Sequence, residues 1–375
     1  MEILRNVGRR ELIGVVIVVV VAAAVAYLGT GFARSHSQAG RATFAGEESA
    51  TLERMTDEDL FAGSVLVARN GKVLLQGGFG LADRALRTPN TPTTRFRIGS
   101  VSKQFTAMAI LMLEKRNRLQ VSDLVCAHLP ACPSAWGQVT IQQLLNHTAG
   151  IENYPYDLAD DPDRFHQPVT PAEQVARAGE RPLVSQPGTE WHYCNVCYAA
   201  LGLVVEKESG TTLTQFLKTQ IFDPLGMRDT GVDQGQTIPH EALGYTRRGT
   251  IGPADRLDLS WAYGAGQMYS TVGDLYRWDE ALYRDRLLGA SPLAQLTRNA
   301  ASTGGVGEQY ANGWFVDSIR GHTRMWHGGG IPGFISQIHR FPDDRAVVIV
   351  LTNLDGHPEI QGVASQLDDW ALSSG

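Results

Sequence analysis

Two runs of alternating apolar residues form a strand-like region near the start of the chain's main body. The stretch GSVLVARNGKVLLQGGFG, residues 63–80, alternates on both sides of Asn70-Gly71. Asn-Gly between two β-rich runs is typical of a two-residue hairpin, because a type I′ turn needs positive φ at both central positions. The pattern therefore predicts an antiparallel hairpin over 63–80.

Apolar residues then recur with helical spacing. Phe105, Met108 and Leu111 follow one face of a helix that is predicted to begin close to Ser100. The segment TIQQLLNHTAG, residues 140–150, is predicted as a helix with a capping threonine at its start and a glycine at its end. Two further helices are predicted, at VCYAALGLVVEKESG (196–210) and TVGDLYRWDEALY (271–283).

Strand-like runs return after residue 310. They are separated by glycine, proline and aspartate turns, and a helix at 358–372 follows them. Strands at both ends with helices between them predict an α+β fold. We expect one antiparallel β-sheet built from both termini and flanked by N- and C-terminal helices. A mainly helical subdomain is expected as an insert at about 120–260.

An unbroken apolar stretch from Leu12 to Leu28 precedes this body, with three arginines ahead of it. Arginines on that side favour a cytoplasmic N-terminus and export of everything that follows. The stretch is short for a membrane span and long for a signal-peptide core, and AVA at 24–26 offers a cleavage site. The protein is therefore predicted to be anchored in the inner membrane, facing the periplasm or the outside, or to be secreted after cleavage.

These patterns divide the chain into four parts. A cytoplasmic n-region at 1–11 is followed by a transmembrane anchor or signal peptide at 12–32. A small, polar linker at 33–50 leads into a single domain at 51–375. The net charge of −6, without a basic stripe, does not indicate a nucleic-acid-binding surface.

The four cysteines fit an exported protein. Cys126 and Cys132 flank a short loop and can pair in an oxidising compartment. Cys194 and Cys197 form a CxxC, which invites a zinc or redox interpretation. Only His192 stands near them as a further ligand, so a disulfide or two buried thiols are favoured over a metal. We predict no metal and no cofactor.

The first candidate for chemistry is Ser100 with Lys103. Residues three apart share a helix face, so the ammonium group can reach the hydroxyl. Backbone N–H groups at a helix start favour a developing oxyanion, and a lysine whose pKa is lowered by burial can take the serine proton. The same residues also fit a polar helix start with Ser102 as its cap.

Two later segments add candidate side chains. In WHYCNVCY, Tyr193 can act as an acid or base, and the amide of Asn195 can bind a substrate carbonyl and the lysine. In MWHGGGIPGF, the N–H groups around Gly329 and Gly330 can complete an oxyanion hole. His327 can offer a donor or a titratable positive charge to a substrate carboxylate. Taken singly, both segments also fit ordinary packing loops.

In combination, these segments resemble the serine β-lactamase and penicillin-binding protein superfamily. The order GSVSK, Tyr-x-Asn and His-Gly-Gly is similar to its class C β-lactamase-like branch, whose second motif is Tyr-x-Asn. LLNHTAGI (144–151) and GAGQMYSTVGDLYRW (264–278) also look like segments of that branch. The resemblance covers about 55–370 and implies a β-lactamase/DD-peptidase-like fold.

The resemblance also implies roles for individual residues. Ser100 becomes the nucleophile, Lys103 its proton-shuttling partner and Tyr193 the general base and acid. Asn195 orients the substrate, and His327 stands where the third motif's lysine would be. The backbone N–H groups of Ser100 and Gly330 form the oxyanion hole.

The third motif departs from the family pattern, because it reads His-Gly-Gly where Lys-Thr-Gly is usual. Loss of the permanent cation weakens the case for efficient β-lactam hydrolysis, and similar motifs occur among the family's D-amino-acid peptidases and esterases. We expect an exported serine hydrolase that acts through an acyl-serine on D-amino-acid peptides, esters or related amides.

Two alternatives stay open beside that function. One is a true class C-type β-lactamase, and the other is a catalytically silent module that binds peptidoglycan or a partner. The expected partner is a small-molecule or peptide substrate, including peptidoglycan-derived ones. Contact with a membrane is expected only through the N-terminal segment, if that segment is uncleaved.

Overall fold

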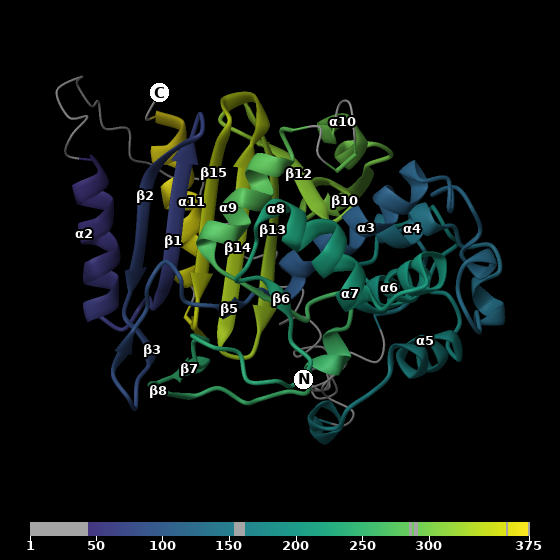
Figure 1. Ribbon diagram of the computed structural model, residues 1–375, viewed down its shortest axis with the longest axis horizontal. Helices are drawn as coiled ribbons and strands as arrows, with labels where there is room; N and C mark the ends of the chain where they lie inside the picture. The colour runs from purple at the N-terminus through teal and green to yellow at the C-terminus, as the bar shows by residue number, and fades with distance from the viewer. Residues whose placement is uncertain (1–43, 154–161, 285–286, 289–291, 358, 374–375) are drawn as a thin grey trace, which may run out of the picture.

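An eight-stranded antiparallel sheet lies at the centre of the molecule (Figure 1). The computed structural model describes residues 44–153, 162–284, 287–288, 292–357 and 359–373. The strand order across the sheet is β10-β11-β12-β13-β14-β15-β1-β2. Its strands are β1 (Gly63–Arg69), β2 (Lys72–Phe79), β10 (Ala301–Gly305), β11 (Gly307–Ala311), β12 (Trp314–Ile319), β13 (His322–Ile331), β14 (Phe334–Phe341) and β15 (Ala346–Thr352).

The two ends of the chain meet inside this sheet. Strand β1 pairs along its whole length with β15, from Gly63 opposite Thr352 onward, and with β2 across a hairpin. Asn70 and Gly71 at the hairpin turn have φ of 52° and 75°, the positive values that a type I′ turn requires. The predicted hairpin and the predicted α+β fold with a sheet from both termini are confirmed.

Helices cover both faces of the sheet, which is why β15 is apolar throughout. Val348 and Val350 face a core shared with α2 (Phe44–Asp57) and α11 (Glu359–Ser373). The intervening residues of β15 face a second and larger core, on the side of α9 (Val272–Ala281). A strand buried on both faces is a continuous apolar run, because its side chains alternate between the two faces.

The remaining helices form the mainly helical part beside the sheet, on the right of Figure 1. They are α3 (Lys103–Lys115), α4 (Ile141–Leu145), α5 (Pro171–Gly179), α6 (Asn195–Ser209) and α7 (Leu213–Leu217), while α8 (Asp223–Leu225) lies near the middle of the view, in contact with α9. Helix α10 (Pro292–Thr297) lies near β11 and β12. Helix α3 is buried along most of its length and packs against α6, so it forms the boundary between the sheet and the helical part.

Short elements complete the chain. The small strands are β3 (Leu81–Asp83), β4 (Thr88–Pro89), β5 (Phe96–Arg97), β6 (Gly231–Val232), β7 (Tyr245–Arg248), β8 (Thr250–Pro253), β9 (Met268–Ser270) and β16 (Leu354–Asp355). Single turns of helix are η1 (Gly99–Ser102), η2 (Val125–Ala127), η3 (Ser134–Trp136), η4 (Pro162–His166), η6 (Leu259–Ala262) and η7 (Pro342–Asp344), and η5 (Lys218–Phe222) is a π-helical turn that joins α7 to α8. In its described residues the insert is therefore mainly helical, with the short strands β6, β7 and β8 in it.

The helix predicted over 140–150 is shorter than expected. Thr140 caps its start with a capping box, as predicted, but α4 ends at Leu145. His147 takes a left-handed conformation with φ of 61°, and the N–H of Thr148 bonds back to the carbonyl of Gln143. This closes the helix in the way that usually needs a glycine, so the sequence does not indicate that the helix ends at this histidine.

The N-terminal predictions extend beyond the described residues. The predicted anchor or signal peptide at 12–32 lies outside them. Across the part of the chain that the structure describes, no helix combines the length and the apolar character needed to cross a membrane. Helix α2 begins at Phe44, so the last residues of the segment 33–50, expected as a linker, are helical.

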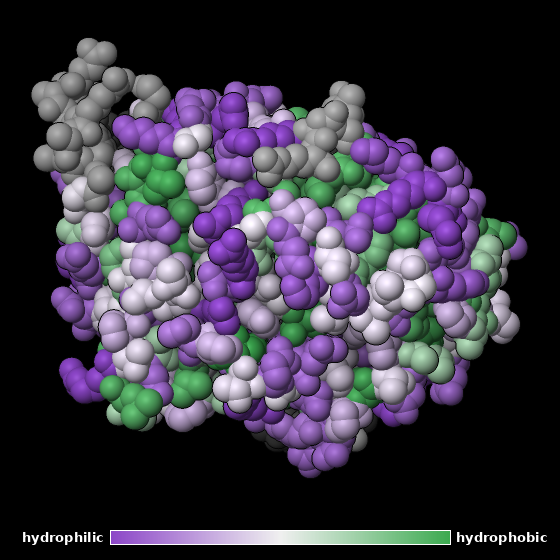
Figure 2. Space-filling view, in the orientation of Figure 1, coloured by the Kyte–Doolittle hydropathy of each residue, from purple (hydrophilic) through white to green (hydrophobic). Residues whose placement is uncertain are grey.

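The surface in the orientation of Figure 1 is mainly polar, with apolar residues in small groups among the polar ones (Figure 2). Large exposed apolar side chains, such as Leu86 and Val184, are far apart in the sequence. Scattered apolar residues of this kind are normal on a folded protein.

Candidate active site

The turn η1 presents one serine and buries the other. Gly99 enters the turn with φ of 48°, and Ser100 is partly exposed. Ser102 is fully buried, and its hydroxyl accepts a hydrogen bond from the backbone N–H of Met268 at 3.2 Å. The Ser102 side chain does not cap α3. Of the two serines, only Ser100 is placed to meet a substrate.

Lys103, the first residue of α3, is fully buried and points at Ser100. Its Nζ lies 3.0 Å from Ser100 Oγ, 2.7 Å from Asn195 Oδ1 and 2.9 Å from the carbonyl oxygen of Ala265. Burial lowers the pKa of this amine well below its usual value. A neutral amine can donate to the two carbonyl oxygens and keep its lone pair for the proton of the serine.

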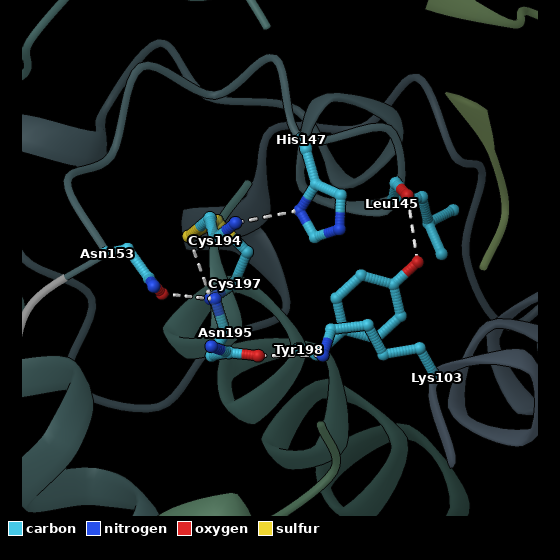
Figure 3. The surroundings of a disulfide bond; sticks show 8 residues. All are labelled: Lys103, Leu145, His147, Asn153, Cys194, Asn195, Cys197 and Tyr198. Atoms are coloured by element: carbon cyan, nitrogen blue, oxygen red, sulfur yellow. Dashed lines mark hydrogen bonds between the residues drawn. A yellow bond between two sulfur atoms is a disulfide. The ribbon is translucent and has the colours of Figure 1, made fainter. Parts of the chain in front are cut away.

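Tyr193 and Asn195 lie on the other side of the lysine, at the start of α6. The Lys103 Nζ lies 4.8 Å from the centroid of the Tyr193 ring. Burial raises the pKa of Tyr193, so this residue rests as a phenol. The backbone N–H of Asn195 donates to Asn153 Oδ1 at 2.7 Å (Figure 3). This bond holds the backbone of the residue whose side-chain amide contacts the lysine.

His327 on β13 is buried beneath the same site. Its Nε2 lies 3.1 Å from the hydroxyl of Tyr310, and its Nδ1 lies 2.6 Å from the carbonyl oxygen of Gly328. Burial lowers the pKa of His327 to about 3. The imidazole is therefore neutral near pH 7, so it does not supply the positive charge that the sequence allowed at this position.

The glycines of β13 let this strand approach the turn of the serine. A Cβ on Gly329 would lie 2.0 Å from the carbonyl oxygen of Ile98, and a Cβ on Gly99 would lie 2.8 Å from the nitrogen of Gly330. No side chain fits at either place. The backbone nitrogen of Gly330 consequently lies beside the turn that carries Ser100, as an oxyanion hole made from these two residues requires.

The structure thus brings together all the residues predicted for the site. Sequence reasoning missed four others that hold them: His147, Asn153, Ala265 and Tyr310. His147 and Ala265 lie in the segments 144–151 and 264–278, which resemble the family and carry no predicted role in the site. Asn153 and Tyr310 carry no signal in the sequence, because only the folded chain brings them to the site.

The four cysteines form two disulfides. Cys126 and Cys132 are joined with an S–S distance of 2.10 Å and close the loop around η2. Cys194 and Cys197 are joined at 2.03 Å, directly at the candidate site (Figure 3). The CxxC is therefore a disulfide, with no thiolate left to bind a metal.

The molecule combines an antiparallel sheet, a helical part beside it, and a buried lysine that contacts a serine at their junction. This combination defines a serine hydrolase of the β-lactamase and penicillin-binding protein superfamily. The protein family described as "Beta-lactamase" matches residues 49–369. The chain belongs to this family.

Individual relatives agree with that assignment. The chain is 31% identical over 312 residues to "Putative penicillin-binding protein PbpX" of Bacillus subtilis (strain 168), covering 82% of this chain and 74% of that protein. Among solved structures, it is similar to a D-stereospecific amidohydrolase from Streptomyces sp., with a TM-score of 0.73, 26% identity, and coverage of 85% of this chain and 97% of that one.

A second solved structure is a D-amino acid amidase from Ochrobactrum anthropi SV3 complexed with L-phenylalanine. Its TM-score is 0.75 at 25% identity, and the similarity covers 88% of this chain and 98% of that one. The likeness therefore includes nearly the whole of both solved enzymes.

Proposed function

We propose that this protein hydrolyses amides and esters of D-amino acids through an acyl-serine intermediate. The observation that carries the proposal is the contact of 3.0 Å between the buried Lys103 Nζ and Ser100 Oγ. A serine hydroxyl is a weak nucleophile unless a base lies within hydrogen-bond reach of it. A lysine with a lowered pKa is such a base.

In the proposed cycle, the neutral amine of Lys103 takes the proton of Ser100 as Oγ attacks the substrate carbonyl. The N–H groups of Ser100 and Gly330 stabilise the oxyanion that forms. The bond to the leaving group breaks, and Tyr193 gives its phenolic proton to the departing amine or alcohol. Lys103 returns its proton to Tyr193. Water then releases the acyl group by the reverse of these steps: it takes the place of the leaving group and gives its proton to Tyr193, and Ser100 takes its proton back from Lys103.

This scheme assigns the base more narrowly than the sequence did. Tyr193 has a raised pKa, so a phenolate is not its resting form, whereas Lys103 has a lowered one. We therefore assign Lys103 as the first proton acceptor and Tyr193 as the proton donor to the leaving group. Asn195 holds the lysine through its Oδ1, and its Nδ2 is assigned to the substrate carbonyl.

The neutral His327 supports amides and esters as substrates. A β-lactam and the C-terminus of a peptide both present a free carboxylate, which a permanent cation would bind. The third motif has a buried neutral imidazole at that place. The D-amino acid amidase and the D-stereospecific amidohydrolase among the similar structures favour the same class of substrate.

Export remains part of the proposal. Two disulfides persist in oxidising compartments, and the arginines before the apolar stretch at 12–28 favour translocation of the rest. Mass measurement of the exported protein's N-terminus distinguishes an anchor, which leaves the stretch in place, from a signal peptide, which is removed.

The test of the function compares D- and L-phenylalanine amide, a chromogenic cephalosporin, and labelling by a fluorophosphonate. We expect turnover of the D-amide and labelling that Ser100→Ala abolishes. The matched control, Ser102→Ala, keeps both, but it loses about 1–3 kcal/mol of stability because the Met268 N–H is left unpaired. Faster turnover of the cephalosporin than of the D-amide would instead establish a β-lactamase, and absence of labelling would establish a silent module.

A further inference from the structure

The turn that carries Tyr193 is held on both sides by one residue. The N–H of His192 donates to the carbonyl of His147 at 2.8 Å, and the N–H of Cys194 donates to His147 Nδ1 at 3.1 Å. The imidazole also packs against the ring of Tyr193, with 4.5 Å between centroids. His147 therefore fixes the backbone immediately before and after Tyr193.

A covalent link continues this anchoring into α6. Cys194 is the N-cap of the helix, and its sulfur accepts the N–H of Cys197 at 3.1 Å while it is also bonded to the sulfur of that residue. Asn195 lies within the four-residue loop that the disulfide closes (Figure 3). The two candidate site residues, Tyr193 and Asn195, are thus the direct neighbours of Cys194 in the chain.

Two free thiols would not fit in the place of the disulfide unless the surrounding residues moved. Both cysteines are buried, with 1% and 0% of their surface exposed. Interiors are close-packed, so two sulfur atoms that each carry hydrogen need space that a bonded pair does not. The N–H groups of Cys194 and Asn195 are hydrogen-bonded to His147 and Asn153. An opening of the loop turns these peptide units and therefore disturbs both hydrogen bonds.

We propose that the Cys194–Cys197 disulfide positions Tyr193 and Asn195 against Ser100 and Lys103, and that hydrolysis by this protein depends on its oxidised state. The inference rests on the proposed function, because it concerns how well the same site works. Small displacements are costly here, since a shift of about 1 Å in a catalytic group can lower the rate by about 10²-fold.

The first test removes the disulfide by substitution. Cys194→Ser/Cys197→Ala keeps an oxygen at the N-cap position, where serine is a favoured residue, so the start of α6 is preserved. We expect kcat for D-phenylalanine amide to fall by about 10- to 100-fold, with KM changed by less than about threefold. The pH profile should change as well, because the contact between Asn195 and Lys103 is disturbed.

The matched control is the second disulfide of the chain. Cys126→Ser/Cys132→Ala removes the link that closes the loop around η2, and neither cysteine is a hydrogen-bond partner of Ser100, Lys103 or Asn195. We expect this variant to keep kcat within about twofold of the wild type. Equal losses in both double variants, or a folded Cys194→Ser/Cys197→Ala protein with wild-type kcat, would overturn the proposal.

The second test uses a dithiol on the folded protein and does not depend on how the first variant folds. In the Cys126→Ser/Cys132→Ala background, dithiothreitol can reduce only the disulfide of the active site. The S–S bond breaks and two S–H groups form, while the dithiol loses two electrons and two protons and closes into a ring. Alkylation followed by mass measurement counts the thiols.

We expect activity to fall as the thiols appear and to return on reoxidation. Resistance of this disulfide to dithiothreitol in the folded protein, or unchanged kcat after complete reduction, would overturn the dependence on its redox state. Fluorophosphonate labelling separates this outcome from failure of the proposed function. If the oxidised protein does not label at Ser100, the function fails; if both forms label at one rate, only the inference fails.

Discussion

At the scale of single residues, the site depends most on the buried amine of Lys103. Because burial lowers its pKa, a neutral base is available at a pH where an exposed lysine is charged. We expect kcat/KM to rise with pH as Lys103 loses its proton and then to level off. A steady-state profile with D-phenylalanine amide measures this limb.

Lys103→Arg tests the same point, since a guanidinium stays charged at every accessible pH. We expect it to lower kcat by about 10²- to 10⁴-fold, the usual contribution of a general base, without a limb that recovers at high pH. The control Lys115→Arg changes an exposed residue of the same helix and should retain activity. An arginine variant at 103 with nearly full activity would contradict the assignment of the base.

His327 makes stability depend on pH, with a sign that follows from its lowered pKa. Its pKa is about 3 in the folded protein and about 6.5 in the unfolded chain, so acidification below 6.5 adds a proton to the unfolded state first. The contribution is fully present above pH 6.5 and is lost as the pH falls toward 3. Between pH 7 and pH 4, we expect it to remove roughly 3 kcal/mol of stability that His327→Gln does not lose.

Denaturant unfolding of both proteins at the two pH values measures that difference. His240→Asn is the control, because it removes an exposed histidine and should keep the slope of the wild type. Equal pH dependence in the wild type and His327→Gln would show that the imidazole is not buried in its neutral form.

The residues of the site differ in how far the sequence reveals them. Ser100 and Lys103 are one helical turn apart, so their contact follows from local geometry. Tyr310 and Asn153 reach the site from β11 and from a loop, and nothing local marks either one. The neutral state of His327 also could not be predicted, because it results from burial beneath Tyr310 and Gly328 in the folded protein.

At the scale of secondary-structure elements, the close approach of β13 to η1 is the feature that builds the site. Gly329→Ala would place its Cβ 2.0 Å from the Ile98 carbonyl oxygen and 2.9 Å from the Ser100 nitrogen. The strand must then move away from the serine. We expect a loss of about 1–3 kcal/mol in stability from overpacking, and a fall of about 10²-fold in kcat.

Gly330→Ala is the matched comparison on the same strand, because its Cβ would have no atom within 4 Å. We expect the Tm of this variant to equal that of the wild type. Thermal melts of both variants together with kcat for Gly329→Ala provide the measurement. A Gly329→Ala protein with the wild-type Tm would show that β13 and η1 are further apart than described.

The elements themselves were predictable where their signals are local. The Asn70-Gly71 turn, the capping threonine of α4 and the left-handed Gly210 that ends α6 were all marked by residue type. The end of α4 was missed because His147 occupies a left-handed position that glycine usually takes. That exception places an imidazole against Tyr193, so the sequence rule failed at a residue of the site.

At the scale of the whole molecule, each half of the structure supplies part of the site. The sheet contributes His327 and Gly330, the helical part contributes Tyr193 and Asn195, and α3 lies between them with Lys103. The sequence predicted a sheet from both termini because its strand-like runs occur at both ends. The strand order could not be predicted, since β1 lies between β2 and β15 through pairing across nearly the full chain.

That pairing has a consequence for how the protein is made. When β1 leaves the ribosome, its partner at 346–352 has not yet been synthesised. The hairpin of β1 and β2 is only marginally stable by itself, and its free edge can pair with other chains. The nascent chain must therefore wait for its last strands before the sheet can form. Gly330 on β13 lies beside the turn η1 that carries Ser100, so the candidate site is incomplete until β13 has been synthesised.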